Sequence, residues 1–139
     1  MIRYLTISAL SGIIFAILDA VINANPLAQK LMSSYGPLAK TSLNLPAGIM
    51  IDLFYGFVMC AIFLLVYNSL PSENAVIKGV IYGLIIWFFR VVMSVLTTYM
   101  TLQVPVKTLV YILLTGLFEM LTIGIFYGLT IKPMNQALD

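Results

Sequence analysis

The fold is decided by one stretch, Ile85-Ile86-Trp87-Phe88-Phe89-Arg90-Val91-Val92-Met93, in which a permanently charged guanidinium interrupts an apolar run long enough to cross a bilayer. A charged side chain in such a run is costly, so it requires a partner or a function. Three further apolar runs each contain one acidic residue in their interior: Asp19, Asp52 and Glu119. The sequence therefore predicts a bundle of membrane helices with a charged interior.

The composition places the whole chain in a lipid bilayer. Of its 139 residues, 62% are hydrophobic and only 9% are charged, whereas a soluble domain carries roughly a quarter charged residues. We therefore expect an integral, multi-pass membrane protein.

Several classes of function are disfavoured by the residue types. The basic residues are scattered, so we expect no nucleic-acid partner. The chain has no histidine, which removes the commonest general base and a common metal ligand. We expect no enzyme, no metal and no cofactor. An aspartyl dyad of Asp19 and Asp52 is the enzymatic alternative, but no glycine-rich motif surrounds either residue.

Proline marks the boundaries of the apolar runs. All six prolines fall at or beyond their edges, where proline is tolerated at helix starts and after helix ends. The resulting spans are residues 4–24, 47–70, 75–100 and 106–131, and each reaches the roughly 20 residues that cross a bilayer. Continuous apolar runs without alternation favour helices over barrel strands. We expect one all-α domain, residues 1–139, folded as a four-helix transmembrane bundle.

The connections define two faces of the bundle. Both termini lie on one face, called side A, and the long loop of residues 25–45 lies on the opposite face, side B. Within this loop, Leu27, Leu31 and Ser34 or Tyr35 fall on one helical face, which predicts a short interfacial helix. The other two connections are tight, so helices two and three, and three and four, should be antiparallel neighbours.

Tyrosines and basic residues give the depth and the orientation. Tyrosine is typical of membrane interfaces, and we expect Tyr4, Tyr67, Tyr82 and Tyr127 at side A and Tyr35, Tyr99 and Tyr111 at side B. The positive-inside rule gives a tie: Arg3, Lys78 and Lys132 against Lys30, Lys40 and Lys107. One interpretation is that copies insert both ways and form a homodimer. The preferred one is that a partner or the insertion machinery settles the orientation.

Every span has a polar stripe at spacings of three and four, which collects residues on one helical face. Lipid cannot satisfy polar groups, so these faces should point inward. The stripes are Ser8, Gly12, Phe15, Asp19 and Asn23; Gly48, Asp52, Tyr55 and Met59; Gly83, Trp87, Arg90, Ser94, Thr97 and Thr101; and Thr108, Thr115, Glu119 and Thr122.

The depths of the charges predict an ion pair. At 1.5 Å per residue, Glu119 is near the midplane, Arg90 is roughly 2 Å toward side B, and Asp19 and Asp52 are roughly 7–9 Å toward side B. Arg90 and Glu119 should therefore pair, and Asp19 and Asp52 share another level. Three acids and one base are neutral together only after uptake of protons or a cation.

Small residues predict the shape of the bundle. The pairs Gly79 and Gly83, and Gly124 and Gly128, follow the small-x-x-x-small pattern that lets helix backbones approach closely. Helices three and four should touch near side A and diverge toward side B. A polar pocket would then open to side B, where the long loop can cover it.

These residues favour transport. We expect the ligand or ion to bind Asp19, Asp52, Tyr55, Arg90 and Glu119, supported by Asn23, Ser94, Thr97, Thr115 and Thr122. The preferred interpretation is a small transporter or channel-like protein for a cation, a proton or a cationic solute. The alternatives are an accessory subunit of a larger membrane complex, in which the charges lock helices together, and a membrane sensor.

Overall fold

The computed structural model describes residues 2–38 and 44–131, and these form an all-helical bundle without strands. Lys40, Lys132 and Pro133 lie outside the described residues. Four helical spans are long and apolar enough to cross a membrane, so the chain is a multi-pass membrane protein by length and composition. They are α1 (Ile2–Ala24); α3 (Leu45–Val66), extended by a 3-10 turn (Tyr67–Ser69); α4 (Ala75–Trp87) with α5 (Met93–Thr101); and α6 (Val106–Thr130).

Asparagine side chains cap the N-termini of three of the helices. The Asn74 Oδ1 atom accepts a hydrogen bond from the Val76 amide at 2.9 Å at the start of α4, and Asn44 does the same for Ala47 at the start of α3. Asn25 caps α2 (Pro26–Met32), the short helix of the first loop, by accepting from the Ala28 amide at 2.8 Å. Such caps satisfy amides that have no partner within the helix.

The helix predicted in the first loop is present, and a 3-10 helix (Ser33–Leu38) follows it. The face of α2 that packs against the bundle differs from the predicted face of Leu27 and Leu31. Ala28 is fully buried, whereas Leu27 is exposed. The Thr108 hydroxyl donates to the Leu31 carbonyl at 3.0 Å and holds α2 against the start of α6.

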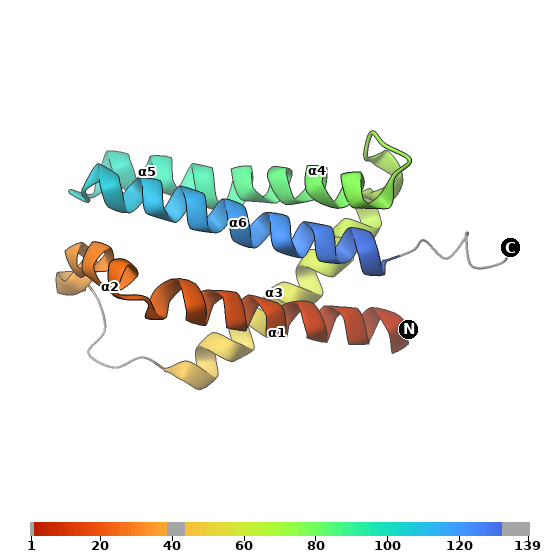
Figure 1. Ribbon diagram of the computed structural model, residues 1–139, viewed down its shortest axis with the longest axis horizontal. Coiled ribbons are helices and arrows are strands. Elements are labelled where there is room, and N and C mark those ends of the chain that lie inside the picture. The colour runs from red at the N-terminus through yellow and green to blue at the C-terminus, as the bar shows by residue number, and fades with distance from the viewer. Residues whose placement is uncertain (1, 39–43, 132–139) are drawn as a thin grey trace, which may run out of the picture.

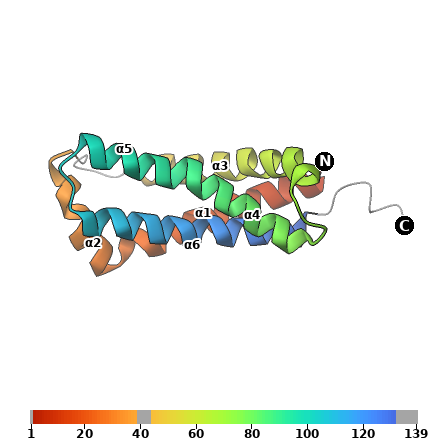
Figure 2. The same ribbon diagram turned by 90° about the horizontal axis from the view of Figure 1, so that it is seen from above.

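The spans pack as two pairs. The helix α4 lies along α6, and α1 lies against α3, which crosses the bundle obliquely (Figures 1 and 2). Contacts between α1 and α6 join the two pairs. The expectation that the third and fourth spans, α4–α5 and α6, are neighbours is confirmed.

The second and third spans, α3 and α4–α5, are not packed along their lengths. The helix α3 is oblique and meets α4 only near side A, where the Tyr82 hydroxyl donates to the Met59 carbonyl at 2.7 Å.

Glycines set both close pairings. A Cβ atom added at Gly79 would overlap the Gly124 carbonyl oxygen, and one added at Gly124 would overlap the Gly79 carbonyl oxygen. Likewise, a Cβ atom at Gly56 of α3 would lie 2.5 Å from the Gly12 nitrogen of α1. The expected close approach of α4 and α6 near side A is confirmed, and a second glycine crossing joins α1 to α3.

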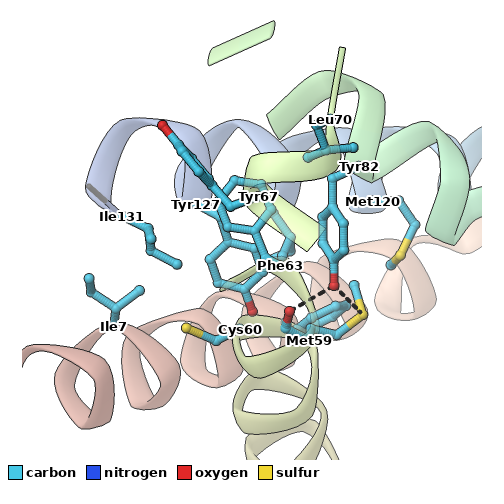
Figure 3. Close-up of a cluster of buried hydrophobic side chains, with 12 residues drawn as sticks. Ile7, Met59, Cys60, Phe63, Tyr67, Leu70, Tyr82, Met120, Tyr127 and Ile131 are labelled. Carbon is cyan, nitrogen blue, oxygen red and sulfur yellow. Dashed lines mark hydrogen bonds between the residues drawn. The ribbon is translucent and has the colours of Figure 1, made fainter. Parts of the chain in front are cut away.

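The main hydrophobic core lies toward side A, where all four spans meet (Figure 3). The Phe63 ring lies 5.1 Å from that of Tyr82 and 5.6 Å from that of Tyr127, measured between ring centroids. The Tyr127 hydroxyl donates to the Ser11 Oγ atom at 2.9 Å. Tyr67, Tyr82 and Tyr127 are buried core residues, and the hydroxyls of Tyr82 and Tyr127 bond inside the bundle. These three residues therefore do not form the exposed interfacial belt expected at side A.

Cationic side chains close the side A ends of two helices. The Lys78 ammonium donates to the Tyr67 carbonyl at 2.7 Å and lies 4.2 Å from the centre of the Tyr67 ring. Arg3 donates to the Thr130 carbonyl at 2.7 Å. Both contacts place a positive charge at a helix C-terminus, where free carbonyls and the helix dipole favour it.

A π-helical turn, Phe88–Val92, interrupts the third span and carries Arg90. The Met93 amide bonds to the Phe88 carbonyl, five residues earlier, so this turn takes up one residue more than an α-helical turn. The buried face consequently passes through Val91 in this turn and continues at Val95.

The predicted stripe of the third span fails at its last two residues. Thr97 and Thr101 are exposed. Their hydroxyls donate to the carbonyls of Met93 and Thr97, four residues earlier, at 2.9 and 2.8 Å. A threonine whose hydroxyl bonds to its own helix has no need of an inward position.

A charged pocket between three spans

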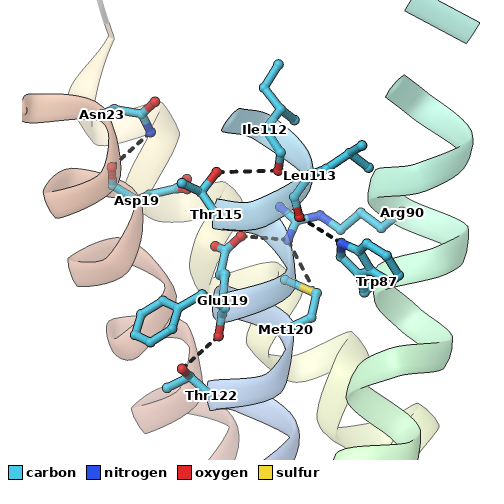
Figure 4. A network of polar contacts seen from close by, with 11 residues as sticks. Asp19, Asn23, Trp87, Arg90, Ile112, Leu113, Thr115, Glu119, Met120 and Thr122 are labelled. Carbon is cyan, nitrogen blue, oxygen red and sulfur yellow. Dashed lines mark hydrogen bonds and ion pairs between the residues drawn. The ribbon is translucent and has the colours of Figure 1, made fainter. Parts of the chain in front are cut away.

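The Arg90 side chain touches every other span. Its Nη1 atom lies 3.6 Å from the Glu119 Oε2 atom of α6 and 3.8 Å from the Met120 Sδ atom (Figure 4). The centre of its guanidinium lies 4.6 Å from the Tyr55 ring of α3 and 5.4 Å from the Phe15 ring of α1. The predicted pair with Glu119 is present, and the two aromatic faces attract the same cation.

Glu119 is the most deeply buried charged group of the pocket. Its side chain is 8% exposed, against 30% for Arg90. The Oε1 atom is buried and has no hydrogen-bond partner among the described residues. In Figure 4 one carboxylate oxygen meets Arg90, while the other is turned toward α1, the helix that carries Asp19. Glu119 therefore keeps one acceptor free inside the bundle.

A cavity of about 210 Å³ lies beside this pair in the side B half. Asp19 and Asn23 of α1, Ser94 of α5 and Thr115 of α6 line it together with Arg90 and Glu119. The remaining lining residues are Ile22, Met32, Val91, Ile112 and Gly116. The predicted polar pocket is thus present in the side B half.

The first loop contributes to the cavity as expected. Met32, at the end of α2, is one of its lining residues. The Tyr111 hydroxyl donates to the Ile22 carbonyl at 2.8 Å and accepts from the Asn25 amide at 2.9 Å. These bonds tie the end of α1 and the start of α2 to α6.

The predicted site residues divide into two groups. Asp19, Arg90, Glu119, Asn23, Ser94 and Thr115 line the cavity. Asp52 and Tyr55 do not line it, although the Tyr55 ring contacts Arg90. In the described part of the chain, Asp52 has neither a hydrogen bond nor an ion pair.

The hydroxyls of the supporting threonines donate to carbonyls of their own helices. Thr115 lines the cavity and donates to the Tyr111 carbonyl at 2.8 Å. Thr122 donates to the Phe118 carbonyl at 2.8 Å and lies outside the cavity, as does the exposed Thr97. Among the three, only Thr115 can offer a hydroxyl to a bound ligand.

Two residues of the site carry no polar signal in the sequence. Met120 contacts the guanidinium through sulfur, and Met32 lines the cavity. Phe15 belongs to the polar stripe of α1 by spacing, and its ring faces Arg90. The periodicity was therefore sufficient to find Phe15, whereas the methionines become visible only from the packing.

The charges of the cavity do not balance. Its lining has two carboxyl groups, Asp19 and Glu119, and one guanidinium, Arg90. In the fully ionised state one negative charge is uncompensated, so a single proton or monovalent cation makes the lining neutral. Such a charge in a low-dielectric interior is strongly disfavoured without a partner.

No protein-family model, curated protein or solved structure matches this chain.

Proposed function

We propose that the protein is a small transporter or channel-like protein that handles a proton, a cation or a cationic solute. The observation that supports this most directly is the cavity with its uncompensated negative charge. Asp19 and Glu119 face it from two helices, and Arg90 neutralises only one of them. Ionisable groups within membrane spans typically mark the pathways of ions and protons.

The geometry suggests exchange at a shared site. A proton and a monovalent cation each restore neutrality, and both would bind the same carboxyl groups. Occupancy by one therefore disfavours occupancy by the other. The π-turn places Arg90 at an irregular point of the backbone, and such turns are frequent at functional sites.

Proton movement in liposomes tests this function. Full-length protein would be reconstituted with an internal pH-sensitive dye, and NaCl or KCl would be added outside. The internal pH should change faster than in protein-free liposomes, and Glu119→Gln and Asp19→Asn should slow the change at least tenfold. Glu73→Gln is the matched control, because Glu73 is an exposed acid in the connection before α4.

The proposal fails if the wild-type protein behaves like empty liposomes for every cation and for a proton gradient imposed alone. Equal loss of activity in the Glu73 variant would also contradict it, since that change leaves the cavity intact. Circular dichroism of each reconstituted variant distinguishes lost activity from lost folding.

A second candidate is an accessory subunit of a larger membrane complex. What supports it is the side B half of α3, where residues 45–51 are all exposed. A Cβ atom at Gly48 would meet nothing within 4 Å, and Asp52 follows on the same stripe. Native mass spectrometry from mild detergent decides between the candidates: a transporter appears alone or as a small homo-oligomer, whereas a subunit appears with other chains in fixed ratio.

A further inference from the structure

The lining of the cavity combines charged and polar side chains with apolar ones. Glu119, Arg90 and Asp19 form the charged part of the lining, and Asn23, Ser94 and Thr115 are its uncharged polar side chains. Ile22, Met32, Val91 and Ile112 are its apolar side chains. Its volume of about 210 Å³ is several times the roughly 30 Å³ that one water occupies in the liquid. An ion without an organic part would leave these apolar side chains without a contact.

The free acceptor of Glu119 needs a hydrogen-bond donor, and an ammonium group supplies N–H donors together with the missing positive charge. Glu119 Oε1 is buried without a hydrogen-bond partner among the described residues, and an unmade bond of this kind costs about 1–3 kcal/mol. A primary ammonium has three donors and one charge. In the described ranges, no three acidic, histidine or cysteine side chains gather closely enough to hold a metal ion.

We propose that the cavity binds a primary ammonium ion with a short apolar tail. Its N–H groups donate to Glu119 Oε1 and to the Asp19 carboxylate, and its tail lies against Val91 and Ile112. Its single charge makes the lining neutral without displacing Arg90 from Glu119. This inference rests on the proposed function and narrows its ligand class.

The same ammonium group could belong to a soluble amine or to an ethanolamine lipid headgroup. Glu119 is midway along the 25 residues of α6, so a headgroup would have to descend about 15 Å through the hydrocarbon to reach it. The soluble amine is the source that this depth favours. Nanodiscs with and without ethanolamine lipid distinguish the two.

Calorimetric titration of the full-length protein in phosphatidylcholine nanodiscs tests the ligand class. Three probes are compared with n-butylammonium: tetramethylammonium has the charge but no N–H donor, n-butanol has the chain but no charge, and Na⁺ has no chain. We expect saturable binding of n-butylammonium and at least tenfold weaker binding of each comparison probe. Half of the lipid is then replaced by phosphatidylethanolamine, and lost amine binding would identify the headgroup as the ligand.

Two variants locate the binding. Glu119→Gln and Asp19→Asn should each weaken n-butylammonium binding at least tenfold, while Glu73→Gln leaves it unchanged. The Asp19 variant keeps the test informative if Glu119→Gln does not fold. The Asp19 side chain makes no ion pair in the described part of the chain, so its replacement breaks none. Ile112→Phe should weaken binding by filling the cavity while leaving every charge in place.

Different results overturn the inference and the proposed function. Equal binding of tetramethylammonium would show that N–H donors are not needed for binding. Equal binding of n-butanol would show that the positive charge is not needed. Either result overturns the inference. If Na⁺ binds in a Glu119-dependent manner and n-butylammonium does not, the inference fails and cation transport survives. If no cation binds and the liposomes show no proton movement, both fail.

Discussion

The Arg90 guanidinium lies 4.6 Å from the centre of the Tyr55 ring, and this contact joins helices that pack against different partners. Tyr55 belongs to α3, which lies against α1, whereas the third span lies along α6. The same guanidinium meets Glu119 at 3.6 Å. One side chain therefore connects both helix pairs in the middle of the bundle.

Arg90→Gln should destabilise the protein by about 3 kcal/mol, because removing one partner leaves a buried charge uncompensated. Adding Glu119→Gln to that variant should recover most of the loss. Unfolding in detergent, followed by fluorescence of Trp87, the single tryptophan, gives the double-mutant cycle. A double variant no more stable than Arg90→Gln alone would show that the two residues are not coupled.

The charge swap Arg90→Glu with Glu119→Arg separates structure from function. Restored folding with lost cation or proton movement would assign the pair to the transport site. Restored folding with restored activity would assign the pair to helix register, with transport depending on other groups of the cavity.

Gly79→Leu should separate α4 from α6 and cost about 1–3 kcal/mol or more, the range for overpacking a tight contact. The cause is direct, because even a Cβ atom at Gly79 overlaps the Gly124 carbonyl. Gly48→Leu is the matched control, since a Cβ atom there meets nothing within 4 Å. Equal stability of the two variants in thermal unfolding would contradict the close backbone contact.

Tyr127→Phe should lower stability by about 1 kcal/mol by deleting one hydroxyl from the core. That hydroxyl contacts the Ser11 Oγ atom at 2.9 Å and the Gly56 carbonyl at 3.1 Å. Tyr99→Phe, at an exposed position, should change stability by less than about 0.5 kcal/mol. Chemical unfolding in mixed micelles measures both, and a neutral Tyr127 variant would mean that the hydroxyl has no role in the α1–α3–α6 junction.

Thr108→Val should loosen α2, because the Thr108 hydroxyl holds the Leu31 carbonyl of that helix. Thr97→Val has the same chemistry and should be nearly neutral, since its hydroxyl bonds only within its own helix. Hydrogen–deuterium exchange over residues 26–33 reads out the difference. The assignment would be contradicted if exchange over these residues became faster in the Thr97 variant. It would also be contradicted if the exchange rate did not increase in the Thr108 variant.

The sequence by itself determined the spans and the depth of the charges. Long apolar runs must form helices in lipid because their backbones have no other hydrogen-bond partner, and the prolines mark where the runs end. Equal depth on adjacent helices was enough to predict the contact between Arg90 and Glu119. The glycine pairs likewise predicted where α4 and α6 touch.

The tertiary structure alone decided which helices pair and which side chains face the cavity. A short loop makes two helices consecutive but does not make them pack, and glycine contacts direct α3 to α1 through Gly12 and Gly56. The π-turn shifts the register of the third span, so Val91 and Val95 face α6 while Thr97 faces outward. Periodicity assumes an unbroken α-helix, and a one-residue irregularity at Arg90 is set by packing that no local pattern contains.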